Sequence, residues 1–303
     1  MLDTRTRTTV RPAHAVALGL AVLYTSYALL RHHAFRTTGY DLGIFEQAVR
    51  SYAAGRWPTS DLKGPGFPLL GDHFHPILAV LAPLYAIAPR AETLLAAQAV
   101  LVAVSAIPVT RYAVDRLGTS RGVVLGVAYG LSWGLYNTIA FDFHEVAFAV
   151  PLLAFSLEAL ARERWNRAIA WALPLVLVKE DLGLTVAAIG GYLVWRGARR
   201  GWAVAVFGVT AFTVTVTVVL PALNPAGDYA YWGQLTTTSG LGWLRLLTVA
   251  ACSRRPVSGR CDPRWSCSPH PPWPGASPPA TPRTGASSTT TAPCSCRSPS
   301  SRS

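Results

Sequence analysis

The stretch AVAVFGVTAFTVTVTVVLPAL, residues 203–223, is an uncharged apolar run about as long as the roughly 20 residues that cross a bilayer as an α-helix. Comparable runs occupy residues 15–30 and 93–109. Hydrophobic residues make up 51% of the chain and charged residues only 14%, whereas a soluble domain carries about 25% charged residues. Because no soluble core requires several such runs, the sequence predicts an all-α polytopic membrane protein.

Arginines outside the C-terminal tail cluster in short segments between the apolar runs. They do not follow one face, so a nucleic-acid partner is not expected despite the formal net charge of +12. The positive-inside rule assigns residues 1–12 to a cytoplasmic basic N-terminus and residues 13–30 to an uncleaved signal anchor. It predicts about seven transmembrane helices in a membrane domain of residues 13–251. The expected location is the bacterial cytoplasmic (inner) membrane, with membrane lipid around the helices.

Residues 168–195 admit two interpretations. They could form one span with Lys179, Glu180 and Asp181 at its middle, or two short spans that meet at this triplet. One span would leave the arginines after residue 195 outside, and each charge at mid-bilayer costs about 2.5–3.5 kcal/mol on insertion scales. The charge rule therefore favours two spans.

Residues 31–75 form the large first external loop of this topology. Within the segment 41–55, DLGIFEQAVRSYAAG, one helical face collects Leu42, Phe45, Ala48 and Val49, as in an amphipathic helix lying at a surface. The segment HPILAVLAPLYAIAP, residues 75–89, is bounded by prolines and too short to span comfortably. We expect two interfacial helices here, the second of them interfacial or re-entrant.

The low-complexity tail, residues 252–303, holds all five cysteines and 11 of the 23 prolines. A structural zinc site is not favoured, because Cys294 and Cys296 lack the usual spacing and a second pair. Two interpretations remain, a disordered segment or an out-of-frame translation. Synonymous codons for residues 288–303 exist whose shifted frame reads HHYSAVLMPIPFVAV, a plausible membrane segment, so we predict a frameshift near codon 251.

The predicted topology places one set of polar residues on the same, non-cytoplasmic side, although they come from four stretches of sequence. They are Asp41, Asp72, His73, His75, Asp142, His144, Glu145, Lys179, Glu180 and Asp181. Histidines with carboxylates could hold a divalent cation, and the candidate ligands are Asp41, Asp72, His73 and His75. The alternative is that these segments are hydrophilic turns and that Asp41 is only the N-cap of a helix.

Four segments carry a family resemblance: YDLGIFEQAV (40–49), LLGDHFHPIL (69–78), FDFHE (141–145) and VKEDLGLTVAA (178–188). They resemble an uncharacterised bacterial family of predicted membrane proteins, over about residues 14–240. The segment recovered from the shifted frame resembles a part of that family with a His-Tyr pair. The family in turn looks like the GT-C superfamily of integral-membrane glycosyltransferases, which use polyprenyl-phosphate sugars and keep a catalytic acidic residue in a large first external loop. Asp41 is the position that matches this residue.

The resemblance implies a glycosyltransferase that moves a sugar from a polyprenyl-phosphate donor on the outer face of the membrane. The expected catalytic residues are then Asp41, Glu180 and Asp181, and the expected substrate-binding residues are Lys179, His73, His75, Asp142, His144 and Glu145. Two alternatives use the same residues. One is an ion- or proton-coupled transporter, for which no inverted repeat is evident, and the other is a non-catalytic membrane scaffold.

Overall fold

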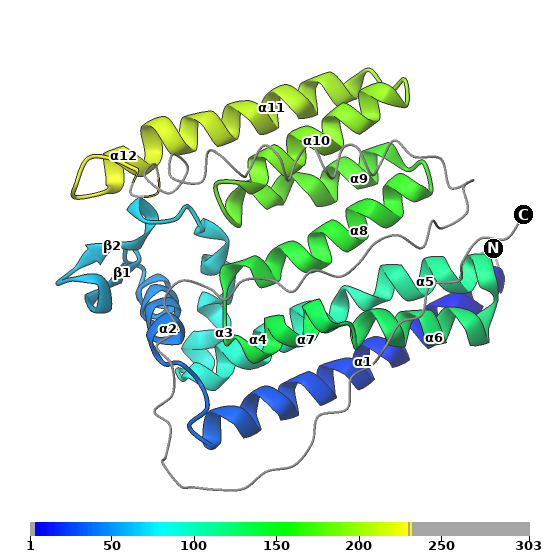
Figure 1. Cartoon of the computed structure of the whole chain (residues 1–303), viewed down its shortest axis with the longest axis horizontal. Helices are drawn as coiled ribbons and strands as arrows, with labels where there is room; N and C mark the ends of the chain where they lie inside the picture. The colour runs from blue at the N-terminus through cyan, green and yellow to red at the C-terminus, as the bar shows by residue number, and fades with distance from the viewer. Residues whose placement is uncertain (1–3, 230, 232–303) are drawn as a thin grey trace, which may run out of the picture. The chain divides into compact units, whose positions relative to one another are not determined.

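A computed structural model describes residues 4–229 and 231, and within them the protein is almost wholly helical (Figure 1). The predicted tail, residues 252–303, lies outside the described residues. The α-helices are α1 (Thr4–His33), α2 (Tyr40–Ala53), α3 (Ala82–Ile87), α4 (Ala91–Val104), α5 (Ala106–Leu117), α6 (Thr119–Gly130), α7 (Trp133–Ala140), α8 (Ala149–Ala161), α9 (Trp165–Ala172), α10 (Leu182–Trp195), α11 (Arg200–Val214) and α12 (Leu220–Leu223).

Short elements connect these helices. The 3₁₀ turns are η1 (Asp61–Lys63), η2 (Leu69–Gly71), η3 (Pro76–Leu81), η4 (Glu145–Phe148) and η5 (Leu173–Leu177), and η6 (Thr215–Val219) is a π-helical turn. Two short antiparallel strands, β1 (Thr59–Ser60) and β2 (Phe67–Pro68), pair Thr59 with Pro68 and Ser60 with Phe67.

Three helical segments of the described chain are long and apolar enough to cross a membrane: Arg11–His33, Ala91–Leu117 and Arg200–Leu223. A fourth results if α6 and α7, which are bent by 42° at their junction, count as one span. The sequence predicted about seven spans. Helices cover the three apolar runs at residues 15–30, 93–109 and 203–223, but the count of seven is not confirmed. α10, for example, has only 14 residues, about 21 Å of helix, and falls short of a bilayer core of about 30 Å.

The helix expected to break at residues 179–181 does break there. η5 ends at Leu177 and α10 begins at Leu182, so the chain turns back at the charged triplet. α10 then packs closely on α11 through glycines. A Cβ on Gly183 would lie 2.8 Å from the carbonyl oxygen of Gly208, and a Cβ on Gly201 would lie 2.6 Å from that of Gly190. Small residues of this kind let membrane helices approach backbone to backbone.

The predicted amphipathic helix is α2, and its apolar face is buried. Leu42, Phe45, Ala48 and Val49 are all inaccessible or nearly so. The helix contacts η3, α3 and α4. The second predicted short helix is also present as η3 followed by α3, which together span Pro76–Ile87 and remain shorter than a membrane span.

The two ends of the helices differ in composition. The turns that follow α5, α8 and α10 lie at the end where the N-terminus is marked, and they carry arginines (Figure 1). The opposite end holds α2, the start of α8 and α12 (Figure 1). The histidines and carboxylates singled out in the sequence gather at this second end.

Candidate functional site

The residues gathered at the α2 end line a cavity of about 260 Å³. Seven of the predicted site residues reach it: Asp41, Asp72, His73, His75, His144, Glu145 and Lys179. The other three, Asp142, Glu180 and Asp181, do not line it. Residues that the sequence did not single out complete the walls, among them Tyr40, Phe45, Lys63, Leu69 and Tyr231.

Asp41 lies in the first turn of α2 but does not cap it. The capping position is Gly39, with φ of 65°, and no side chain accepts a hydrogen bond from the helix N-terminus. The carboxylate of Asp41 is therefore available to the cavity. Its Oδ2 lies 3.7 Å from Nε2 of His144, and its side chain is 38% exposed. The N-cap alternative for Asp41 is thus wrong, because the helix begins one residue earlier.

His144 is fixed through its backbone and through two aromatic contacts of its ring. Its backbone N–H donates to Oε1 of Gln98 at 2.8 Å. The rings of Phe45 and Phe141 lie with their centroids 5.2 and 4.9 Å from that of the imidazole. Nδ1 of His144 is buried and has no hydrogen-bond partner among the described residues.

Asp142 faces away from the cavity and fastens the loop before α2. It has a left-handed backbone, with φ of 70°, and its side chain is almost fully buried. Its Oδ2 accepts hydrogen bonds from the backbone N–H and the hydroxyl of Thr38, at 2.7 and 2.8 Å. Asp142 therefore joins the turn that carries His144 to the turn that carries Asp41, which makes it a positioning residue.

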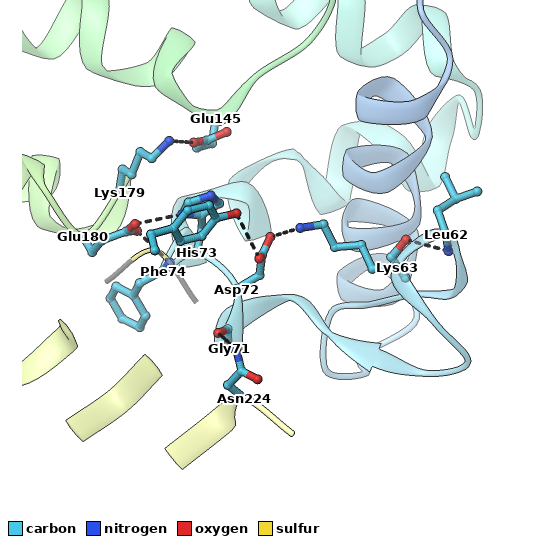
Figure 2. Close-up of polar contacts among 12 residues, drawn as sticks. Leu62, Lys63, Gly71, Asp72, His73, Phe74, Glu145, Lys179, Glu180 and Asn224 are labelled. Carbon is cyan, nitrogen blue, oxygen red and sulfur yellow. Dashed lines mark hydrogen bonds and ion pairs between the residues drawn. The ribbon is translucent and has the colours of Figure 1, made fainter. Parts of the chain in front are cut away.

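Glu145 and Lys179 form a partly buried ion pair on the inner wall of the cavity. Nζ of Lys179 lies 3.3 Å from Oε1 of Glu145 (Figure 2). Burial lowers the pKa of Lys179, but the negative charges of Glu145, Glu180 and Asp181 outweigh it and raise this pKa above its usual value, so the amine is cationic. Oε2 of Glu145 is buried with no hydrogen-bond partner in the described part of the chain.

Glu180 lies behind His73 and holds it in place. Oε1 of Glu180 accepts a hydrogen bond from Nδ1 of His73 at 2.8 Å, and Oε2 accepts one from the backbone N–H of Phe74 at 3.1 Å (Figure 2). The hydroxyl of Tyr229 donates to Oε1 at 3.3 Å. Burial raises the pKa of Glu180, but its contacts with His73 and the backbone amides bring it below the usual range. Its neighbour Asp181 is exposed.

Asp72 links a lysine and a tyrosine that both line the cavity. Its Oδ2 forms an ion pair with Nζ of Lys63, and its Oδ1 accepts a hydrogen bond from the hydroxyl of Tyr231 at 3.2 Å. The Tyr231 ring stacks on His73 with centroids 4.7 Å apart. Burial, aided by Asp72, raises the pKa of Tyr231 to about 12, so the phenol stays protonated.

Lys63 and Lys179 are the only two lysines of the chain, and both line the cavity. Every other permanent side-chain cation is an arginine. A lysine amine is a compact charge with three donors on a flexible stem, which differs from the rigid guanidinium fork. The sequence analysis missed Lys63, whose ion pair with Asp72 places it in the site.

His75 is the most deeply buried histidine of the cavity. It is 3% exposed, and its Nδ1 has no hydrogen-bond partner among the described residues. Burial lowers its pKa below the usual value, although Glu145 acts in the opposite direction, so the imidazole is neutral near pH 7. The ring of Phe45 packs edge-on against it at 5.9 Å.

The four candidate metal ligands line the cavity without converging. Across residues 4–229 and 231, no group of three or more histidine, cysteine, aspartate or glutamate side chains is placed to hold a metal ion. Asp72 is paired with Lys63, and His73 with Glu180. The residues present therefore do not form the site expected for a divalent cation.

Comparison with known proteins identifies a family. Residues 31–249 match the model of a family described as predicted membrane protein (DUF2079). Neither the curated proteins nor the solved structures contain a match.

Proposed function

The chain belongs to the DUF2079 family of predicted membrane proteins, and from that premise we propose that it is a GT-C-like glycosyltransferase acting on a polyprenyl-phosphate sugar. The observation that carries the proposal is the content of one cavity. An accessible Asp41–His144 pair, both lysines of the chain and two further histidines, His73 and His75, all line it.

The polar side chains that line the cavity favour a polyhydroxyl ligand. Among them are Asp41, His73 and His144, which are partly exposed. Sugar hydroxyls can both donate and accept hydrogen bonds, so they can pair with carboxylates, imidazoles and amines alike. At about 30 Å³ for each water-sized group, a cavity of about 260 Å³ suits one sugar ring rather than an oligosaccharide.

The lysines favour a donor that carries phosphate. In transfer from a polyprenyl-phosphate sugar, negative charge develops on the leaving phosphate, and fixed cations nearby stabilise it. Lys179 makes one ion pair, with Glu145, and an ammonium group has three donor hydrogens. It can therefore contact a phosphate oxygen without losing that pair. Lys63 lies on the same cavity, paired with Asp72.

Asp41 is the residue best placed to act as general base. In the proposed reaction its carboxylate takes the proton of the acceptor hydroxyl while the hydroxyl oxygen attacks the anomeric carbon. The bond from that carbon to the phosphate oxygen breaks, and polyprenyl phosphate leaves with the electron pair. His144, at 3.7 Å, supports the charge change at Asp41. Glu180 positions His73 and takes no part in proton transfer.

The proposal includes an orientation in the membrane. We place the cavity and residues 31–75 on the non-cytoplasmic side of a bacterial inner membrane, with the N-terminus in the cytoplasm. The arginine-bearing turns at the opposite end support this orientation. The full count of about seven crossings requires the shorter helices α8, α9 with η5, and α10 to cross as well, with the bilayer thinned around them.

A frame change near codon 251 also remains our proposal. The family match ends at residue 249, next to the change in composition, which supports it. Genomic sequencing across codons 245–303 tests it, and an intact reading frame with the coding bias of the preceding region would contradict it. Activity is therefore measured on the chain as it stands and on the chain with the frame restored.

The functional test is sugar transfer by Asp41→Asn protein. Asparagine has nearly the size of aspartate but cannot take the proton, so transfer from a polyprenyl-phosphate sugar should fall by about 10²–10⁴-fold. Glu92→Gln is the matched control, because Glu92 also lies in the first turn of a helix, α4, but does not line the cavity. Unchanged transfer by the Asp41→Asn protein, or absence of transfer by wild-type protein in both forms, would contradict the proposal. Solute flux without transfer would favour a transporter.

A further inference from the structure

The arginine-bearing end of the helices contains a second, larger cavity of about 630 Å³. It lies where the turn between α8 and α9 meets the turn between α10 and α11. Its walls include four arginines, Arg164, Arg167, Arg199 and Arg200. Apolar side chains, among them Trp165 and the fully buried Leu193, supply the remaining surface. The cavity thus combines cations with an apolar wall.

Most of these arginines have no anionic partner. Within the part of the chain that the structure describes, no carboxylate forms an ion pair with Arg164, Arg167 or Arg199. Arg200 donates a hydrogen bond to the neutral side chain of Asn166 at 2.6 Å. Glu163, the acidic residue on the wall, is already paired with Arg196.

Neighbouring arginines at the same end are arranged differently. Nε of Arg111 donates to Glu158 at 2.9 Å, and Nε of Arg162 donates to the same carboxylate at 2.8 Å. Arg162 also forms an ion pair with Asp115. These guanidinium groups stabilise the fold through carboxylates. The arginines of the cavity lack such partners, and their charge is available to an anion.

Exposed tryptophans place this cavity at the level of lipid headgroups. Trp195 ends α10 and is 77% exposed, and Trp202 lies in the first turn of α11 and is 64% exposed. Tryptophan is enriched at membrane–water interfaces, because its ring is apolar and its N–H is polar. The helix ends that carry the cavity arginines therefore lie at an interface, where phospholipid phosphates are abundant.

We propose that this cavity binds an acidic phospholipid of the leaflet at that end, with the headgroup phosphate on the arginines. Arg164 and Arg167 contact the phosphate, and an acyl chain lies along the apolar wall near Trp165. Guanidinium groups match phosphate oxygens in charge and in bidentate geometry. The inference is independent of the proposed glycosyltransferase activity, because this cavity shares no residue with the one that contains Asp41.

Native mass spectrometry of the full-length chain from nanodiscs tests the proposal. One set of nanodiscs contains phosphatidylcholine alone, and the other contains phosphatidylcholine mixed with phosphatidylglycerol. Wild-type protein should retain bound phosphatidylglycerol in preference to phosphatidylcholine. The double variant Arg164→Gln/Arg167→Gln should bind phosphatidylglycerol about 25-fold more weakly, roughly fivefold for each charge removed near an anionic lipid.

The control is Arg116→Gln/Arg121→Gln, which removes two charges beside the turn between α5 and α6, outside this cavity. It should leave phosphatidylglycerol binding unchanged. An equal loss in the control would contradict the proposal, since the effect would then be one of general surface charge. So would the absence of a preference for phosphatidylglycerol. Inorganic phosphate is a third arm, and if it competes as effectively as the lipid, the site binds a free anion and the lipid assignment is wrong.

Discussion

Replacement of Glu180 by alanine should loosen the segment that carries two cavity residues, Asp72 and His73. The Glu180 carboxylate accepts hydrogen bonds from His73, from the backbone of Phe74 and from Tyr229. These donors come from two segments distant in sequence from η5 and α10. Loss of the carboxylate therefore removes one acceptor that three donors from these two segments share.

The expected cost follows from these contacts. A hydrogen bond to a charged group contributes about 1.5–3 kcal/mol, and a buried donor left without a partner costs about 1–3 kcal/mol. His73 is 25% exposed and can bind water in the variant, which reduces its share. We expect Glu180→Ala to lower the free energy of unfolding by about 2–4 kcal/mol.

The loss should also depend on pH. The pKa of Glu180 lies below its ordinary value of 4.5 in the folded protein, because His73 and the backbone amides favour the ionised form over the opposing effect of burial. The stabilisation is therefore complete above about pH 4.5 and is lost as the pH falls through the lower, folded pKa. The difference between wild type and Glu180→Ala should shrink accordingly in acid.

Unfolding by sodium dodecyl sulfate in mixed micelles measures this difference. The matched control is Asp181→Ala, which removes the adjacent, exposed carboxylate and should change the free energy by less than about 0.5 kcal/mol. If the two variants lose the same stability, or if Glu180→Ala loses none, the assignment of Glu180 as the shared acceptor is wrong.

Three further results are expected. Burial lowers the pKa of His75 from 6.5, so the folded protein should lose stability as the pH falls below about 6.5. His75→Gln should therefore reduce the change in melting temperature between about pH 7 and pH 5. If the melting temperature of the variant changes with pH as steeply as that of wild type, the assignment to His75 is wrong. Gly190→Leu should lower the free energy of unfolding by about 1–3 kcal/mol, because the side chain would push α10 away from α11. Gly191→Leu should not, because that glycine faces open space. Equal losses of stability in the two variants would contradict close packing of α10 on α11 at Gly190. In a background without native cysteines, a cysteine at the exposed position of Phe35 should react with a membrane-impermeant thiol reagent added outside the cell. Arg116→Cys should not react under the same conditions. The reverse pattern would overturn the proposed orientation.

Local patterns in the sequence predicted several features of the fold. Apolar spacing identified the buried face of α2, because a helix must bury that face somewhere whatever its neighbours are. The charged triplet at residues 179–181 identified the break before α10, because three adjacent charges are costly in the middle of an apolar span. The number of membrane crossings was harder to predict, since apolar content alone does not decide whether a 14-residue helix spans.

The site was predicted only in part, because side-chain direction depends on contacts between distant segments. Asp142 and His144 share one motif, yet the left-handed backbone at Asp142 turns its carboxylate to Thr38, while His144 faces the cavity. Lys63 gave little signal by itself, as a single charge in a turn rich in glycine and proline. Its place in the site follows from its ion pair with Asp72.

Photo-crosslinking of the donor shows whether the cavity at the α2 end binds a polyprenyl-phosphate sugar. The probe carries a diazirine on its sugar ring, and mass spectrometry maps the adducts on the full-length protein in detergent. We expect adducts on the residues that line the cavity, such as Tyr40, Phe45 and Tyr231, and their loss when unlabelled donor is added in excess. Adducts confined to other surfaces, or adducts in the cavity that excess donor does not reduce, would contradict this expectation.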